Sequence, residues 1–375
     1  MVANELSRAS ASRQVLPTGI VDCDVHVELE NGASILEYMS RSWRKRFELR
    51  YYNRSRPAAP QSERTPQPLG KAGRREGASP PGGGTPGSNP AFTAMQALDP
   101  FNVTSALLTQ TKAAINHYTN ADDATAVAAA SNDYFIERWL PADSRYRLAI
   151  LIAPQDPNEA AKEIRRHAAN PQVAAVFLSP IQISAGSRYY DPIYAAASSE
   201  DLPIVFHPGG GEGNYQGAPT NAGGIHSTYA EHYSALCQYG MAHLQSIIFE
   251  GPLEKFPNLR FGFLELGWTW VPSLLWRMDS AWKGARIEVP WVKKAPTEYV
   301  TERIRFASQP AVEVPNQKYL DIQLEMMNAS HTMMFSSDYP HYDSDDADQV
   351  FTKVSPELKQ RIFRDNALST FPRLL

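Results

Sequence analysis

Short apolar runs alternate with amphipathic stretches along most of the chain. The apolar runs lie at 20–27, 103–108, 148–153, 173–178, 203–207, 259–264, 303–308 and 332–337. Helical periodicity marks 33–49, 122–139, 158–169, 189–199, 228–249, 271–282 and 356–369. Apolar strands separated by helices are typical of a parallel sheet. Eight of them predict an α/β fold, a closed (β/α)₈ TIM barrel. A doubly wound open sheet is the alternative, but no Gly-x-Gly-x-x-Gly follows a strand.

One region lacks this alternation of apolar runs and amphipathic stretches. Between 54 and 90, Pro and Gly fill 15 of 37 positions and no aromatic residue occurs. Such a segment cannot build a core, so we expect a long loop at 50–92, inserted after the first strand–helix unit. Long loops within domains are functional lids or disordered, and a lid would lie over the barrel mouth. The predicted organisation is a polar N-terminal arm at 1–19 and one barrel domain at 20–375.

Composition narrows the possible partners. The net charge of -4 and the pI near 6.2 argue against nucleic acid or an anionic membrane as a partner. Two cysteines, Cys23 and Cys237, fit a reducing compartment. No apolar run reaches the roughly 18 residues of a membrane span, and the first 20 residues lack a signal-peptide core. A cytoplasmic protein that acts on a small molecule is therefore expected.

The first apolar run carries the earliest candidate chemistry. On a strand at 21–28, Asp22, Asp24 and His26 would share one face. Burying acids and a histidine together is costly without a partner, and a divalent metal is an ordinary partner for both. The alternative is an edge strand whose polar side faces water.

Three later strands also end on residues capable of chemistry, and in TIM barrels function lies at these ends. His207 follows the fifth run, Glu265 the sixth and Asp338 the eighth. His207 is a candidate metal ligand, or else a core histidine bonded to a carbonyl. Asp338 is a candidate ligand or proton acceptor, or else a helix cap or turn carboxylate. Together these strand ends favour a metal centre.

Four motifs together resemble one known family. They are Asp-x-His at 24–26, His-Pro-Gly-Gly at 207–210, Glu-Lys-Phe-Pro-Asn-Leu-Arg at 254–260 and Ser-Ser-Asp-Tyr-Pro-His at 336–341. This combination is similar to the amidohydrolase-related branch that includes aminocarboxymuconate-semialdehyde decarboxylase and γ-resorcylate decarboxylase. The resemblance implies a (β/α)₈ barrel with one divalent ion, most often zinc and sometimes manganese. The ligands it implies are Asp24, His26, His207 and Asp338, and family members are commonly homodimers or homotetramers.

The sequence departs from the family pattern at two positions. Asp24 stands where the family has histidine or glutamate. A carboxylate at this position shifts the expected metal preference from zinc toward manganese. Glu265 stands where family decarboxylases have a histidine, in a His-x-Gly setting. A glutamate there is a general base or a metal ligand rather than a cationic donor.

Glu265 therefore makes hydrolysis the leading hypothesis. A metal-bound water would attack an amide, ester or C–C bond of a small aromatic or carboxylated substrate, and Asp338 would accept its proton. The alternative is non-oxidative decarboxylation of a hydroxylated aromatic acid. A third hypothesis, less favoured, is a barrel that has lost catalysis and only binds.

Other polar and aromatic side chains are expected near the site. His232 and His243 are candidate proton donors, and His226 and His341 candidate substrate contacts, although ordinary structural roles are the alternative for each. Trp268 and Trp270 would wall an aromatic substrate. Helix packing or a subunit interface is the alternative for the tryptophans after the sixth strand.

Overall fold

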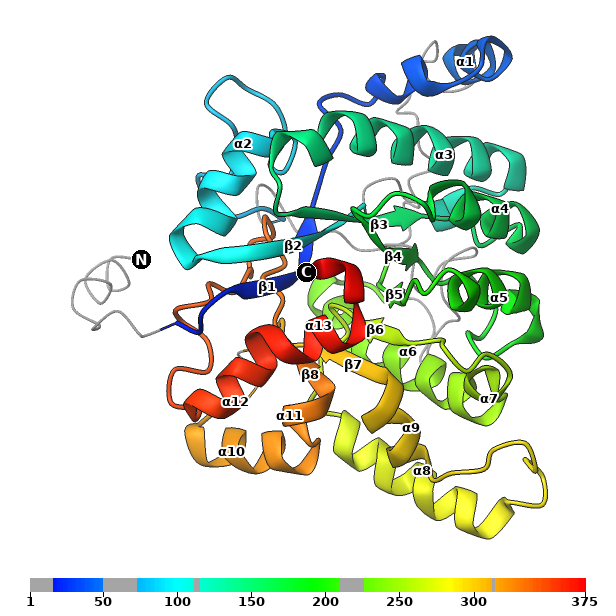
Figure 1. The fold of residues 1–375 in the computed structure, drawn as a ribbon, viewed down its shortest axis with the longest axis vertical. Helices are drawn as coiled ribbons and strands as arrows, with labels where there is room; N and C mark the ends of the chain where they lie inside the picture. The colour runs from blue at the N-terminus through cyan, green and yellow to red at the C-terminus, as the bar shows by residue number, and fades with distance from the viewer. Residues whose placement is uncertain (1–15, 50–72, 111–114, 210–225, 312–313) are drawn as a thin grey trace.

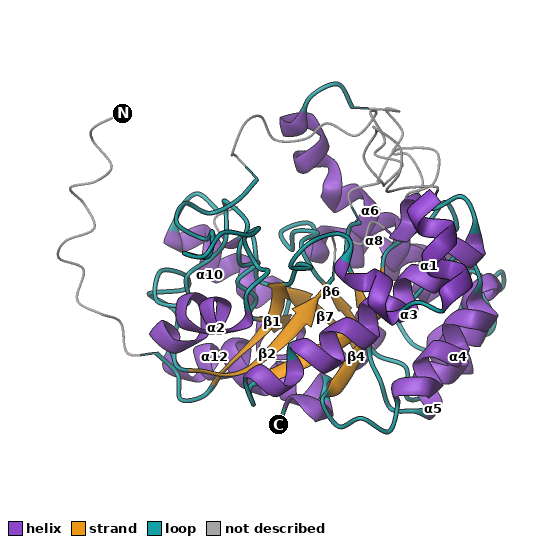
Figure 2. Ribbon diagram, turned by 90° about the horizontal axis from the view of Figure 1, so that it is seen from above, coloured by secondary structure: helices purple, strands orange, loops and turns teal. Residues whose placement is uncertain are grey.

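A parallel sheet of eight strands forms the centre of the molecule (Figures 1 and 2). The computed structural model describes residues 16–49, 73–110, 115–209, 226–311 and 314–375. The strands are β1 (Ile20–His26), β2 (Val103–Thr109), β3 (Tyr146–Leu151), β4 (Val173–Leu178), β5 (Ile204–Phe206), β6 (Phe261–Phe263), β7 (Ile304–Ala307) and β8 (Met333–Met334). Each strand pairs in parallel with the next in sequence. The predicted parallel strands are confirmed, although β5 to β8 are shorter than the apolar runs.

The sheet closes between β1 and the segment that follows β8. The Cys23 N–H donates to the Phe335 carbonyl at 3.0 Å, and the His26 N–H donates to the Tyr339 carbonyl at 2.7 Å. Val25 also forms a parallel bridge with Tyr339. These bonds lie beyond the end of β8, so the closure depends on extended backbone that is too irregular to count as strand. The (β/α)₈ barrel predicted from the sequence is confirmed.

Helices surround the strands (Figure 2). The α-helices are α1 (Arg41–Phe47), α2 (Pro90–Thr93), α3 (Ala121–Arg138), α4 (Pro157–His167), α5 (Asp191–Ser199), α6 (Tyr229–Phe249), α7 (Pro252–Lys255), α8 (Val271–Ala285), α9 (Pro296–Arg303), α10 (Gln317–Met326), α11 (Ala329–Thr332), α12 (Pro356–Gln360) and α13 (Asn366–Thr370). Side-chain caps begin several of them: Asn120 accepts from the Asp123 N–H, and Thr228 from the Glu231 N–H. Among the described helices, none is long and apolar enough to cross a membrane.

Short 3₁₀ and π segments complete the secondary structure of the described residues. The 3₁₀ segments are η1 (Ser34–Tyr38), η4 (Asp99–Phe101), η6 (Ile115–His117), η7 (Leu140–Ala142), η8 (Arg188–Tyr190) and η11 (Pro372–Leu374), and the π segments are η3 (Ala94–Leu98) and η10 (Arg361–Asp365). The helix expected at 33–49 is split into η1 and α1. Helices α9 and α10 had no counterpart in the predicted pattern.

The C-terminal segment covers one end of the barrel (Figure 1). A Cβ on Gly262 of β6 would lie 3.0 Å from the Phe371 ring, so this glycine makes room for that ring. The Arg147 guanidinium of β3 donates to the Arg373 carbonyl at 2.9 Å. Because this end is filled by the chain itself, the carboxyl ends of the strands form the other, functional end.

Part of the predicted inserted loop is described, and it lies at that functional end. Arg74 pairs with Glu28, just past β1, at 3.0 Å, and the Arg75 N–H donates to the Pro340 carbonyl, past β8, at 2.9 Å. The Glu28 N–H donates to the Gly87 carbonyl at 2.8 Å. Residues 73–89 hold no helix or strand, as expected, and α2 begins at Pro90. The expectation for 50–72 lies outside the described residues.

Candidate metal centre

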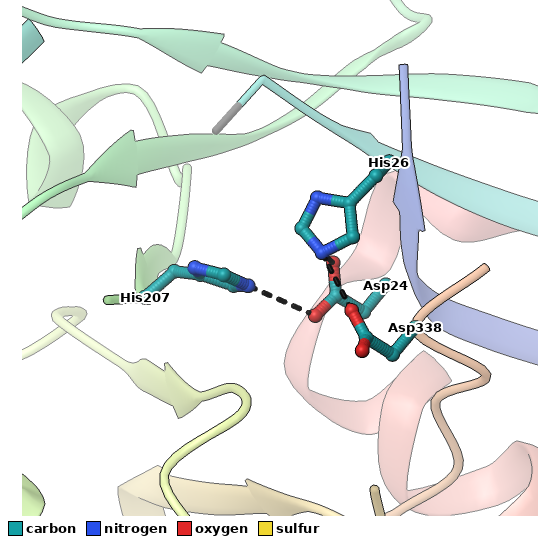
Figure 3. A group of neighbouring side chains, drawn as sticks. All are labelled: Asp24, His26, His207 and Asp338. Carbon is teal, nitrogen blue, oxygen red and sulfur yellow. Dashed lines mark ion pairs between the residues drawn. The ribbon is translucent and has the colours of Figure 1, made fainter. Parts of the chain in front are cut away.

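Two side chains of β1 point into the barrel at its functional end (Figure 3). Asp24 and His26 are both 1% exposed. Thr109, the last residue of the neighbouring β2, donates its hydroxyl to Asp24 Oδ1 at 2.7 Å and lies 3.1 Å from His26 Nδ1. Thr109 thus orients both side chains from one position, which leaves His26 Nε2 directed at Asp338 Oδ1, 2.6 Å away.

His207 enters from the end of β5. Its Nδ1 lies 2.6 Å from the Pro208 carbonyl, and only a protonated Nδ1 can donate there. In the neutral ring this leaves Nε2 as the atom with a free lone pair, which is the usual way a protein prepares a histidine ligand. Nε2 lies 3.2 Å from Asp24 Oδ2 and 3.3 Å from Glu265 Oε2, so both carboxylates face this nitrogen.

Asp338 follows β8 in an uncommon backbone conformation. Its φ of 59° is left-handed, which few residues other than glycine adopt. The Asp338 N–H donates to the Asp24 carbonyl at 3.0 Å, so the segments carrying the two carboxylates are bonded directly to each other. The side chain is fully buried and accepts from His341 Nδ1 at 2.8 Å.

The four predicted ligands converge. Asp24, His26, His207 and Asp338 each offer a ligand atom, and these atoms all lie within 4.8 Å of one another (Figure 3). Two imidazoles and two carboxylates are ordinary ligands of divalent cations. Two buried carboxylates side by side are costly unless a cation lies between them. These residues therefore fit a divalent ion.

The pKa shifts of these side chains reflect the same cost of burying charged groups close together. Burial, together with the charges of Glu265 and Asp24, raises the pKa of Asp338 well above its usual range. Burial also lowers the pKa of His26 well below its usual range. For His207, burial favours the neutral ring, but the Asp24 carboxylate outweighs it and raises the pKa to about 9. A bound cation would relieve the repulsion between carboxylates that raises the pKa of Asp338.

A second group of candidate ligands shares His26 and Asp338 with the first. His26, Glu265, Asp338 and His341 also offer ligand atoms within 4.8 Å of one another. Glu265 follows β6 with a left-handed φ of 51°, and its side chain is 13% exposed. The His341 ring lies 4.4 Å from the His26 ring, centre to centre. Both predicted residues therefore adjoin the centre.

Three predicted histidines lie in helix α6 or just before it, at different depths. His226 and His232, 3.5 Å apart between their Nδ1 atoms, lie at its N-terminal end beside Tyr229. Burial lowers the pKa of His232 to about 4, so the ring is neutral at pH 7. His243 is 1% exposed and accepts from the Ala185 N–H at 3.1 Å. Among the described residues, neither His232 nor His243 belongs to a group of candidate ligands, and the bond from Ala185 fixes the orientation of the His243 ring.

The two predicted substrate-binding tryptophans lie in the core. Trp268 is fully buried, and its Nε1 donates to the carbonyls of Ser308 and Pro310. Trp270 is 6% exposed, and its Nε1 donates to the Leu266 carbonyl at 2.9 Å. These bonds anchor the segment after β6 and leave the indoles little surface to offer a ligand.

Several residues at the mouth were missed by sequence reasoning. The Tyr233 hydroxyl of α6 donates to Asp343, to which Gln309 also donates, at 3.3 Å. Asp22 was placed on the same strand face as Asp24 and His26, but its actual contact was not expected: it accepts the Ser337 N–H at 2.9 Å and ties β1 to the segment after β8. The position of Thr109 could have been recognised from the sequence, because this polar residue follows an apolar run just as His207 does. No spacing in the sequence connects Tyr233 with Asp343.

Comparison with known proteins decides the family. The family model described as Amidohydrolase matches residues 21–373. The chain belongs to the amidohydrolase family. The resemblance inferred from the four motifs is thereby confirmed, and the chain is an enzyme of this superfamily.

Amidohydrolases similar to this chain include decarboxylases. The chain is 26% identical over 297 residues to a γ-resorcylate decarboxylase of Rhodococcus jostii (strain RHA1), covering 74% of this chain and 86% of that protein. It is 23% identical over 289 residues to one from Polaromonas sp. (strain JS666), covering 73% and 85%. A crystal structure of 5-carboxyvanillate decarboxylase from Novosphingobium aromaticivorans, with manganese and 4-hydroxy-3-methoxy-5-nitrobenzoic acid, matches with a TM-score of 0.67 at 18% identity. That match covers 97% of this chain and 100% of the other. At this identity the structural match supports the fold.

Proposed function

We propose that this amidohydrolase removes CO₂ non-oxidatively from a hydroxylated aromatic acid. The observation that carries the proposal is the match to two γ-resorcylate decarboxylases along most of the chain. The residues that converge at the barrel mouth are compatible with it. The order of the two enzyme hypotheses from the sequence is thus reversed, since decarboxylation ranked second there.

The proposed roles follow from the contacts of each side chain. Asp24, His26, His207 and Asp338 would hold one divalent ion. When bound, the ion would supply positive charge that fixes the carboxylate and neighbouring hydroxyl of the acid. Asp338 Oδ1 and His341 Nδ1 are 2.8 Å apart, so a proton lies between them. We assign this pair the delivery of the proton to the ring carbon that loses CO₂.

An aromatic substrate also agrees with the side chains of the mouth. The Tyr229 and Tyr233 rings of α6 stack at 5.7 Å, and the Tyr342 ring lies 6.5 Å from Tyr229. Flat rings with polar edges favour a flat hydroxylated partner. Zinc, expected from the sequence, and manganese are both candidates for the ion. The homodimer or homotetramer and the cytoplasmic location expected from the sequence stay predictions.

A matched pair of acids tests the reaction. Protein reconstituted with Mn²⁺ or with Zn²⁺ is incubated with 2,6-dihydroxybenzoate, whose hydroxyls adjoin the carboxylate, and with 3,5-dihydroxybenzoate, whose hydroxyls do not. We expect CO₂ and resorcinol from the first acid only, because the second cannot present both oxygens to one ion. If neither this acid nor other ortho-hydroxy acids release CO₂, the proposal is wrong.

Hydrolysis is the second candidate because of one contact. Glu265 places a carboxylate 3.3 Å from His207 Nε2, where a general base for an attacking water would stand. Esters and amides of the same aromatic acids, assayed in parallel, distinguish the two reactions by their products.

A further inference from the structure

Arg305 of β7 is a buried cation that has no counter-charge among the described residues. It is 7% exposed, and the ion pairs of the described residues do not include it. A buried charge without a partner is strongly destabilising. We infer that Arg305 and its neighbour Arg260 bind a dianionic oxyanion of the phosphate type at the amino-terminal end of the barrel. This site lies opposite the metal centre and does not depend on the proposed function.

The two arginines lie on the same side of neighbouring strands. The ring of Phe306, which follows Arg305, packs 5.6 Å from the ring of Trp270, beside α8, so Arg305 faces the other way, into the barrel. Gly262 of β6 pairs with Arg305, and Arg260 lies two positions before Gly262 on the same face. Burial and the charge of Arg260 lower the pKa of Arg305 to about 10. Two guanidiniums that are both charged at pH 7 therefore repel each other at this end of the barrel.

Neither guanidinium uses all of its hydrogen-bond donors. Arg305 Nη1 donates to the carbonyls of Thr301 and Ile304, at 3.1 and 2.9 Å. Arg260 Nη2 donates to Asp201 Oδ1 at 2.6 Å. Within the described residues, the Nε atoms of both arginines are buried without a partner. Nη2 of Arg305 and Nη1 of Arg260 also donate to no described residue but are not enclosed, so a ligand can reach them.

The charges favour a dianion over other small anions. Asp201 is the carboxylate that pairs with Arg260, and its side chain is 55% exposed, so solvent weakens its charge. Guanidiniums bind phosphate through paired N–H···O bonds, and a phosphate group carries about −1.5 to −2 charges at pH 7. One such group has enough oxygens to accept from both arginines. Chloride or a carboxylate balances only one of the two positive charges.

Access to the site is from the rim of the barrel. The C-terminal segment fills this end, but the Arg260 side chain is still 21% exposed. Free inorganic phosphate and the phosphoryl group of a small organic molecule share the required chemistry. Titration with inorganic phosphate and with glycerol 1-phosphate distinguishes these two sources.

The main test compares two arginines at the same end of the barrel. Arg305→Met removes a guanidinium with unused donors. Arg147→Met removes one whose Nε, Nη1 and Nη2 all donate to carbonyls. Binding of inorganic phosphate to the ion-loaded protein is measured by calorimetry at constant ionic strength, with sodium chloride as the reference. We expect Arg305→Met to weaken phosphate binding about 10- to 100-fold, because charge-assisted hydrogen bonds are lost, and Arg147→Met to leave it unchanged.

Asp201→Asn gives a second test with the opposite sign. Asp201 has a left-handed φ of 53°, a conformation that asparagine tolerates, so we expect this variant to fold. It removes the carboxylate that competes for Arg260, and phosphate should bind about 3-fold tighter. This variant tests the inference even if Arg305→Met does not fold. Unchanged or weaker binding in Asp201→Asn overturns it.

Two other outcomes would also overturn the inference. Phosphate could bind at the metal centre instead, and His207→Ala tests this. Loss of phosphate binding in His207→Ala, with normal binding in Arg305→Met, would place the anion at the functional end. An equal effect of chloride and phosphate at the same ionic strength would show only charge screening.

Discussion

His207 and His243 are two histidines with the same burial and opposite surroundings. Each is 1% exposed, and Phe206 connects them: His207 follows it in the chain, and the His243 ring packs 4.7 Å from the Phe206 ring. His207 faces carboxylates, and the pKa is raised to about 9. His243 faces an apolar layer and one backbone N–H, and burial lowers the pKa to about 4.

The comparison shows that burial alone does not identify a functional histidine. Burial in apolar surroundings favours the neutral ring, which then serves as a packed hydrogen-bond acceptor. Only neighbouring acids turn such a position into one that attracts a cation. His207 and His243 differ in the groups that surround their rings, so we expect substitutions at the two positions to have different effects.

The largest effect is expected from His207→Ala. Loss of this ligand should reduce the bound ion from about one per chain to a small fraction, and decarboxylation by more than about 100-fold. Elemental analysis and CO₂ release measure the two effects. The matched variant His243→Leu should keep its ion. If both variants retain the ion equally, His207 is not a ligand.

A smaller effect is expected on stability below neutral pH. His243 has a pKa near 6.5 in the unfolded chain and about 4 in the folded one, so its stabilising contribution is present above pH 6.5 and is lost as the pH falls toward 4. Between pH 7 and 4.5 the native protein should lose about 2 kcal/mol of unfolding free energy more than His243→Leu does. Urea unfolding at both pH values measures this difference. Equal losses would show that His243 is not a buried neutral ring.

The smallest effect is expected from Trp268→Phe. This change removes the two hydrogen bonds of Nε1 to Ser308 and Pro310 and should cost about 1 kcal/mol of stability. It should leave the KM for the acid nearly unchanged, because the indole is buried away from the mouth. A KM raised tenfold, without loss of stability, would return Trp268 to the substrate-binding role first expected from the sequence.

The barrel was predictable because apolar runs and amphipathic stretches are local signals. The sequence did not predict where β8 ends, because the closure with β1 depends on backbone bonds of Phe335 and Tyr339 rather than on side-chain pattern. Helix α10 was missed because Leu324 is its one buried residue, which leaves almost no apolar periodicity to detect.

The strand-end residues of the candidate site were predictable for a different reason. In a parallel barrel the carboxyl ends of all strands meet, so His207 and Asp338 had to approach Asp24 if the fold was right. Residues on the covering helices follow no such rule. His243 and Tyr233 lie on the same helix, yet one packs against Phe206 and the other bonds Asp343. Their roles depend on tertiary contacts that periodicity does not record.

The hydrogen bond from the Asp338 N–H to the Asp24 carbonyl has a consequence for how the enzyme matures. Proteins emerge from the ribosome N-terminus first, so Asp24 and His26 are made long before Asp338 exists. If the proposed ion binds here, a growing chain would carry only part of its ligand set, and binding would wait until the last strand is made. Once bound, the ion would link the part of the barrel that is synthesised first to the part that is synthesised last.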